Sequence, residues 1–260
     1  MKTLAMTPID TLASTAAASP HGAANPEISR SAALPNRAYT SHDEWLKERD
    51  TVVAQSGMSA ISSMLLALAK PGDVIVYSEP IYGGTDTLLN GLLKQLGMIP
   101  VGFMSSEGIS AFKAAVADAK NKGNIAVVML ETPDNPTNNL LDIAECRRIM
   151  DEATAGQAEK PVLAVDNTVV GPIWQKPLDH GADLCLYSLT KYVGGHSDLV
   201  GGSISGSKDI VTKVRRVRNA IGTTMDWPNT HLCYFLNDQI RGVRLPIIFG
   251  DQAIQLRAFQ

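Results

Sequence analysis

The sequence has few cysteines, few aromatic residues and no long uninterrupted apolar segment. Its three cysteines, Cys146, Cys185 and Cys233, are odd in number and too far apart for a disulfide framework or a zinc site. We therefore expect a reducing, cytoplasmic compartment and no bound metal. Aromatic residues make up only 5% of the chain, which disfavours a surface that stacks nucleic-acid bases. No run of 18 apolar residues occurs, so we expect no transmembrane helix.

The sequence also lacks a large excess of positive or negative charge. The chain has 23 Lys and Arg against 26 Asp and Glu, a net charge of −3, so the basic excess typical of nucleic-acid-binding proteins is missing. Hydrophobic residues make up 45% of the chain, enough to bury a sizeable core and to exclude a wholly disordered protein. A length of 260 residues predicts one large domain, or one domain with a fragment of another.

The N-terminal segment differs in composition from the rest of the chain. Residues 1–25 are rich in Ala, Ser, Thr and Pro and contain no compact apolar stretch, which favours an arm over a signal peptide. We predict an N-terminal arm over residues 1–50, a large domain over residues 51–235, and an atypical tail over residues 236–260. That tail would be at most the beginning of a small C-terminal domain.

After residue 50, segments of strand type alternate with segments of helix type. Ser56 is placed to cap a helix that runs to Leu68, where Pro71 and Gly72 follow. The other predicted helices span 85–96, 109–120, 142–153 and 208–219. The predicted strands span 51–54, 73–77, 98–103, 124–130, 161–166, 183–187 and 203–205. This alternation predicts an α/β fold, a mostly parallel sheet with helices on both faces.

Polar residues gather where the predicted strands end. Tyr82 follows one strand, Glu131 follows a second, Asp166 ends a third, and residues 188–191 follow a fourth. Ligands of open α/β sheets bind beyond the carboxyl ends of the strands. The sequence therefore predicts a functional site at this edge of the sheet.

Four of these features suggest one chemistry. Lys191 follows a buried strand, where loss of water would favour the uncharged amine that forms imines. Asp166 ends an apolar strand and needs a cation, which a protonated pyridine could supply. The free N–H groups of Gly57 and Met58 at a helix start could hold a phosphate. Tyr82 could lie over an aromatic ring.

Each feature taken alone has an ordinary alternative. These are a surface lysine, a capping or salt-bridged aspartate, a capped helix and a packed loop tyrosine. Together with the hydroxyls of Ser188 and Thr190, however, the four form a consistent set for binding pyridoxal 5'-phosphate (PLP).

Five linked motifs, found in the right order between residues 50 and 230, resemble the Cys/Met-metabolism family of PLP-dependent enzymes. This family includes cystathionine γ-synthase, cystathionine γ- and β-lyases, methionine γ-lyase and O-acetylhomoserine sulfhydrylase. The motifs are AQSGMSAI at 54–61, YSEPIYGG at 77–84, ETPDNPT at 131–137, VDNT at 165–168 and YSLTKYVGGHSD at 187–198, and IGTTMD at 221–226 also fits. The resemblance implies the large domain of an aspartate-aminotransferase-like (fold type I) enzyme, with the small C-terminal domain largely absent.

The resemblance also implies roles for individual residues. Lys191 resembles the lysine that forms the Schiff base and Asp166 the partner of the pyridine nitrogen. Tyr82 resembles the ring-stacking residue that assists proton transfer, and Asn135 the asparagine beside the phenolic oxygen. Glu131 matches a recurrent acid near the cofactor. The remaining implied cofactor-binding residues are Ser56 at the helix start, the phosphate ligands Gly57, Met58, Ser188 and Thr190, and Arg30, with Tyr39 as the alternative to Arg30.

Members of the family act on small amino-acid substrates and assemble as homo-oligomers, dimers or tetramers. The resemblance therefore implies γ- or β-elimination or replacement on cystathionine, methionine or O-acylhomoserine-type substrates. Two alternatives remain open from the sequence. The chain could be a truncated paralogue that binds PLP or pairs with a full-length subunit without turnover. Tyr187 and Lys191 also fit the Tyr/Lys pair of short-chain dehydrogenases, although the glycine-rich dinucleotide turn is missing.

Overall fold

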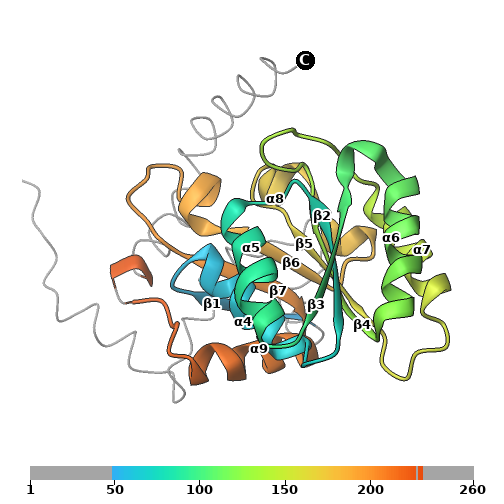
Figure 1. Ribbon diagram of the computed structural model, residues 1–260. Coiled ribbons are helices and arrows are strands. Elements are labelled where there is room, and N and C mark those ends of the chain that lie inside the picture. The colour runs from blue at the N-terminus through green and yellow to red at the C-terminus, as the bar shows by residue number, and fades with distance from the viewer. Residues whose placement is uncertain (1–48, 227, 231–260) are drawn as a thin grey trace, which may run out of the picture.

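The protein folds around one seven-stranded sheet (Figure 1). The structure, a computed structural model, describes residues 49–226 and 228–230. The strands are β1 (Arg49–Ala54), β2 (Val74–Glu79), β3 (Ile99–Met104), β4 (Ile125–Glu131), β5 (Val162–Asp166), β6 (Leu184–Ser188) and β7 (Gly202–Ser207). Their order across the sheet is β1-β7-β6-β5-β4-β2-β3.

Helices connect most of these strands. The α-helices are α4 (Gly57–Leu68), α5 (Gly83–Thr87), α6 (Gly108–Lys122), α7 (Ile143–Ala153), α8 (Gly171–Trp174) and α9 (Lys208–Ala220). Four short 3₁₀ or π segments are η1 (Leu88–Leu93), η2 (Ser105–Glu107), η3 (Pro177–His180) and η4 (Leu189–Val193). The predicted helix over 85–96 thus begins at Gly83 and continues as the π-helical η1.

The predicted α/β class with a mostly parallel sheet is confirmed. Strands β2, β3, β4, β5 and β6 all run parallel to their neighbours within this group. Strand β7 is the exception, because it pairs antiparallel with both β6 and β1. It follows that β1 points in the same direction as the parallel strands, so its end leads into α4 at the edge where those strands also end.

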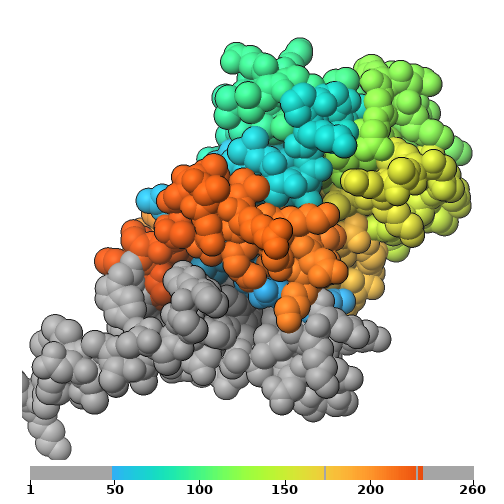
Figure 2. Space-filling view, turned by 90° about the horizontal axis from the view of Figure 1, so that it is seen from below, coloured from blue at the N-terminus to red at the C-terminus, as the bar shows by residue number. Residues whose placement is uncertain are grey.

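Apolar side chains cover both faces of the sheet, as expected for strands buried on two sides. Because side chains alternate along a strand, Ile75 and Tyr77 of β2 join the core beneath α4 and α9, whereas Val74 and Val76 join the core beneath α6 and α7. Figure 1 shows these two helix pairs on opposite sides of the sheet. In Figure 2, α9 forms the orange surface beside the cyan α4 region, with which it packs closely.

Two of the predicted helix starts are capped by side chains. Ser56 Oγ accepts a hydrogen bond from Ser59 N at 3.0 Å, and Asp142 Oδ1 accepts one from Glu145 N at 3.0 Å. Such caps stabilise a helix by about 1 kcal/mol each. Within the described residues, no helix combines the length and apolar character needed to cross a membrane. The predicted domain boundaries at residues 50 and 235 stay predictions, because most of both flanking segments lies outside the described residues.

Candidate active site

A cavity of about 920 Å³ opens at the edge of the sheet where the parallel strands end. Its lining comes from the start of α4, from residues that follow β2 and β4, and from the ends of β5 and β6. Every predicted site residue within the described part of the chain lines it: Ser56, Gly57, Met58, Tyr82, Glu131, Asn135, Asp166, Ser188, Thr190 and Lys191. Arg30 and its alternative Tyr39 lie outside the described residues.

The start of α4 forms one side of the cavity. The helix has 12 residues, and its first N–H groups, those of Gly57 and Met58, have no partner within the helix. Gly57 is required here by close packing, because a Cβ at this position would lie 3.0 Å from Ser188 Cβ. A Cβ on Gly202 of β7 would likewise clash with the Ser56 carbonyl oxygen. Glycine at both positions therefore allows the start of α4 to pack closely against β6 and β7.

Two acidic side chains form the floor of the cavity. Glu131 ends β4 and Asp166 ends β5, and the two residues are register partners across the parallel strands. Both side chains are buried. Within residues 49–226 and 228–230, neither forms an ion pair with Lys, Arg or His. Two adjacent buried carboxylates without a cation are costly to ionise.

The protonation of both acids reflects this environment. Burial, reinforced by repulsion from Asp166, raises the pKa of Glu131 to about 8. Burial also raises the pKa of Asp166, against the opposing effect of hydrogen bonds from Thr168 N at 3.0 Å and Thr168 Oγ1 at 2.6 Å. A cationic ring beside Asp166 would favour its ionised form, so the floor fits a ligand that carries positive charge.

The backbone of Tyr82 is hydrogen-bonded to one of these two acids. Its backbone N–H donates to Glu131 Oε2 at 2.8 Å, while its side chain remains about half exposed toward the cavity. A Cβ on Gly84 would lie 2.7 Å from Tyr82 Cε1 and 3.0 Å from Met58 Sδ. The glycine after Tyr82 and Gly83 therefore makes room for the ring to fold back toward the start of α4.

The two hydroxyl residues after β6 differ in how they are held. The Ser188 N–H donates to Thr168 Oγ1 at 2.8 Å, which links the ends of β5 and β6. Thr190 Oγ1 lies 3.0 Å from Gly201 N, whose hydrogen bond it accepts, and 3.3 Å from Gly201 O. The Thr190 hydroxyl is thus already bound to the backbone, whereas the Ser188 side chain is half-buried at the cavity.

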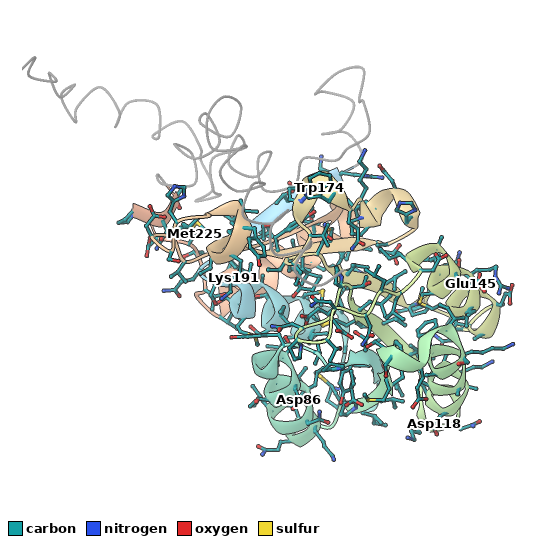
Figure 3. All side chains as sticks on the ribbon, turned by 90° about the horizontal axis from the view of Figure 1, so that it is seen from above. Asp86, Asp118, Glu145, Trp174, Lys191 and Met225 are labelled. Atoms are coloured by element: carbon teal, nitrogen blue, oxygen red, sulfur yellow. The ribbon has the colours of Figure 1, made fainter. Side chains whose placement is uncertain are left out.

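Lys191 lies in the π-helical η4 and lines the cavity, but its side chain is exposed. The expectation that its place after a buried strand would strip the amine of water is therefore wrong. The backbone of η4 departs from helical geometry at Lys191 itself, with φ −86° and ψ −120°, and no local pattern in the sequence predicts this. Figure 3 shows Lys191 on the side of the molecule opposite Asp118 of α6 and Glu145 of α7.

Sequence reasoning assigned no role to Thr168, Asn167 or Gln175. The structure places Thr168 in the cavity lining and Asn167 and Gln175 directly behind it, in a hydrogen-bond network that includes Tyr187. Thr168 could have been found, since it belongs to the VDNT segment, but no local signal marks Gln175. The Tyr187 hydroxyl accepts from Asn167 Nδ2 at 3.0 Å, and burial raises the pKa of Tyr187 well above its usual value. This environment does not support the dehydrogenase alternative, which needs an accessible, acidified tyrosine.

The described residues contain no group of three or more His, Cys, Asp and Glu side chains arranged to hold a metal ion. The site is instead built from one amine, two buried acids, hydroxyls and a helix start.

Comparisons with known proteins agree with this arrangement. The model of the Cys/Met metabolism PLP-dependent enzyme family matches residues 41–244. The chain is 38% identical over 174 residues, 66% of its length, to both L-methionine gamma-lyase of Treponema denticola and cystathionine gamma-synthase of Escherichia coli. It is 33% identical over 183 residues, 70% of its length, to human cystathionine gamma-lyase. These matches cover 41%, 42% and 42% of the three relatives, respectively.

Solved structures give the same result. The crystal structure of cystathionine gamma-synthase from Xanthomonas oryzae pv. oryzae, in complex with aminoacrylate and cysteine, superimposes with a TM-score of 0.65 at 31% identity. The similarity covers 74% of this chain and 47% of that one, so the chain spans less than half the length of that enzyme. The family match extends over most of the sequence, and the chain belongs to the family of Cys/Met metabolism PLP-dependent enzymes.

Proposed function

We propose that this chain binds PLP in the cavity and catalyses γ- or β-elimination or replacement on a sulfur-containing or O-acylated amino acid. The observation that carries the proposal is that Lys191 and Asp166 line one cavity together with the start of α4. An amine, a buried acid and a phosphate-binding helix start are the three groups that PLP binding needs. Relatives with these names, cystathionine gamma-synthase and L-methionine gamma-lyase, support the reaction class.

The residues present fit this cofactor. The cavity volume of about 920 Å³ falls within the range of about 300–1,000 Å³ typical of small-molecule sites. The buried pair Glu131 and Asp166 lacks a cation in the described part of the chain, and a protonated pyridine would supply one. The N–H groups of Gly57 and Met58 and the Ser188 hydroxyl would hold the phosphate, with Arg30 as a further ligand.

PLP, when bound, supplies an aldehyde for imine formation and a ring that accepts an electron pair. Lys191 would hold the aldehyde end and, once released by the substrate, move a proton at the substrate Cα. Asp166 would keep the pyridine nitrogen protonated. Tyr82 would stack on the ring and donate a proton to the departing substituent. Asn135 would contact the phenolic oxygen.

Elimination would expel the protonated substituent and, with hydrolysis by one water, release a 2-oxo acid and ammonia. Replacement would expel the same substituent and join a thiol to the carbon that carried it. We propose a homo-oligomer as the working form, as the resemblance implies. A cytoplasmic location is also proposed. It is supported by the free, buried thiols of Cys146 and Cys185, which need no oxidising compartment.

The test begins with the full chain and PLP. A visible absorbance band that borohydride converts to a stable adduct would support the proposal. Lys191→Ala should abolish that band, and Lys213→Ala, on the exposed side of α9, should keep it. Release of 2-oxo acid from methionine, cystathionine, homocysteine and O-acetylhomoserine then tests elimination, and formation of a thioether from O-acetylhomoserine with added cysteine tests replacement. A band without product from any of these would favour a cofactor-binding paralogue over an enzyme.

A further inference from the structure

The side-chain amide of Gln175 joins two sides of the cavity that are far apart in sequence. Gln175 directly follows α8, whose last residue, Trp174, is labelled in Figure 3. Its Nε2 donates to the Thr132 carbonyl oxygen at 2.6 Å and to Asn167 Oδ1 at 2.9 Å. One amide group thus contacts the segment after β4 and the segment after β5 at the same time.

The first segment, residues 131–135, carries two proposed cofactor contacts. Thr132 directly follows Glu131 and leads into the turn that places Asn135 at the cavity. Its hydroxyl accepts from Leu141 N at 2.9 Å, which closes the turn. The Thr132 carbonyl is one of the points at which other parts of the chain hold this segment; Tyr82 N also donates to Glu131 Oε2, and Ser105 Oγ to Asp134 Oδ2.

The second segment, residues 166–168, carries the proposed partner of the pyridine nitrogen. Asn167 lies between Asp166 and Thr168, both of which line the cavity. Asn167 Nδ2 lies 3.0 Å from each of the Gly171 carbonyl, the Gln175 carbonyl and the Tyr187 hydroxyl. Asn167 and Gln175 therefore bind each other in both directions, through the side chains and through the Gln175 backbone.

Both groups that accept from Gln175 belong to fully buried residues, since Thr132 and Asn167 each have 0% exposure. A buried acceptor that loses its donor pays most of its desolvation cost, and water has little access to replace the donor. Loss of the Gln175 amide would therefore remove the contact between Thr132 and Asn167, while the paired strand ends at Glu131 and Asp166 would still join β4 to β5.

From this geometry we propose that Gln175 is a positioning residue that fixes how residues 132–135 lie relative to residues 167–168, beyond the point where Glu131 and Asp166 pair in the sheet. The inference rests on the proposed function for its consequence, because the cofactor would lie between these two sides. Gln175 does not line the cavity and is not proposed to touch the cofactor.

Gln157 provides a matched control, because it contacts the start of β4, whereas Gln175 contacts the residue that follows the end of β4. Gln157 Nε2 donates to the Ile125 carbonyl at 3.1 Å and to the Glu159 carbonyl at 3.2 Å, at the start of β4. Gln157→Glu removes the same type of donor as Gln175→Glu, but at the edge of the sheet away from the cavity. Any effect of Q175E that Q157E shares is an effect on general stability.

The first measurement is amide hydrogen exchange on the chain without cofactor. Q175E should speed exchange in residues 132–141 and 166–171 by about tenfold and leave other segments as in the wild type, whereas Q157E should leave both segments unchanged. If Q175E does not fold, Gln175→Met removes the donors without adding a charge and takes its place. Wild-type exchange in both segments of the variant would overturn the inference.

The second measurement is the PLP dissociation constant, from the visible absorbance band. Q175E should weaken binding by about tenfold, and Q157E should leave it within about twofold of the wild type. Equal weakening in both variants would overturn the positioning role. Wild-type protein that binds no PLP would instead overturn the proposed function, and the exchange experiment would still decide whether Gln175 joins the two segments.

Discussion

Glu131 and Asp166 occupy register positions on neighbouring parallel strands, and both side chains are buried at the base of the cavity. Neither has a cationic partner within the described residues. Like charges held side by side in a poorly solvated site disfavour ionisation of both. The pair therefore favours a ligand with a positive charge at this place, which is the electrostatic basis of the proposed cofactor site.

The raised pKa of Glu131 predicts how the stability of the cofactor-free protein depends on pH. An acid with a folded pKa of about 8 and an ordinary pKa of 4.5 weakens the fold where the unfolded chain ionises and the folded chain does not. Stability should fall by roughly 1.4 kcal/mol per pH unit between these values through this group. Glu131→Gln should flatten the slope, as measured by urea unfolding from pH 5 to pH 8. Equal slopes in both proteins would contradict the assignment.

Asp166→Asn should weaken cofactor binding without lowering the stability of the cofactor-free protein. The amide oxygen can still accept from Thr168, and the buried charge is lost, so the cofactor-free protein should be as stable as the wild type or more stable at pH 8. The PLP dissociation constant should rise by about tenfold or more, because a charge-assisted hydrogen bond contributes about 1.5–3 kcal/mol. Urea unfolding and absorbance titration on the same samples measure both. Loss of stability with unchanged affinity would point to a structural aspartate instead.

Thr168→Val should damage the link between β5 and β6. The substitution removes the hydroxyl that accepts from Ser188 N and donates to Asp166, and it leaves the Ser188 N–H without its acceptor. We expect a loss of about 1–3 kcal/mol in the free energy of unfolding and weaker PLP binding. Thr168→Ser keeps the hydroxyl and should retain most of both. If the serine variant behaves like the valine variant, the missing methyl group rather than the hydrogen bonds explains the effect.

Gly57 and Gly91 should respond oppositely to alanine. Gly91 lies within η1 with open space around its Cβ position, so Gly91→Ala should stabilise the protein by up to about 1 kcal/mol. At Gly57 the new methyl group would meet Ser188 Cβ at 3.0 Å and push the helix start from β6. Gly57→Ala should therefore give no such gain and should weaken binding of PLP more than binding of pyridoxal, which lacks the phosphate. Equal effects on the two ligands would argue against a phosphate site at α4.

Much of the fold could be predicted because its signals are local. Apolar strands such as 124–130 and 161–166 fall within one residue of β4 and β5, and Pro71 and Gly72 end α4 as expected. The antiparallel direction of β7 had no such signal. Its glycines and serines show no pattern that distinguishes the two directions, and the choice depends on pairing with β1 and β6.

In the site too, residues marked by local sequence signals could be predicted, and residues that depend on distant contacts could not. Residues directly after strands, such as Glu131 and Asp166, could be placed because parallel strands end at one edge. Gln175 could not, since its partner Thr132 lies 43 residues away and nothing near either residue reveals the contact. The sequence also predicted a desolvated Lys191, whereas its side chain is exposed, because its surroundings depend on the backbone conformation of η4.

The most direct test of the proposed chemistry is to locate the amine that bonds to PLP. The full chain is incubated with PLP, reduced with borohydride, digested and analysed by mass spectrometry. The account predicts a phosphopyridoxyl group on the peptide that contains Lys191, at about one per chain, and its loss in Lys191→Ala. Label spread over surface lysines such as Lys213, with Lys191 unmodified, would contradict it.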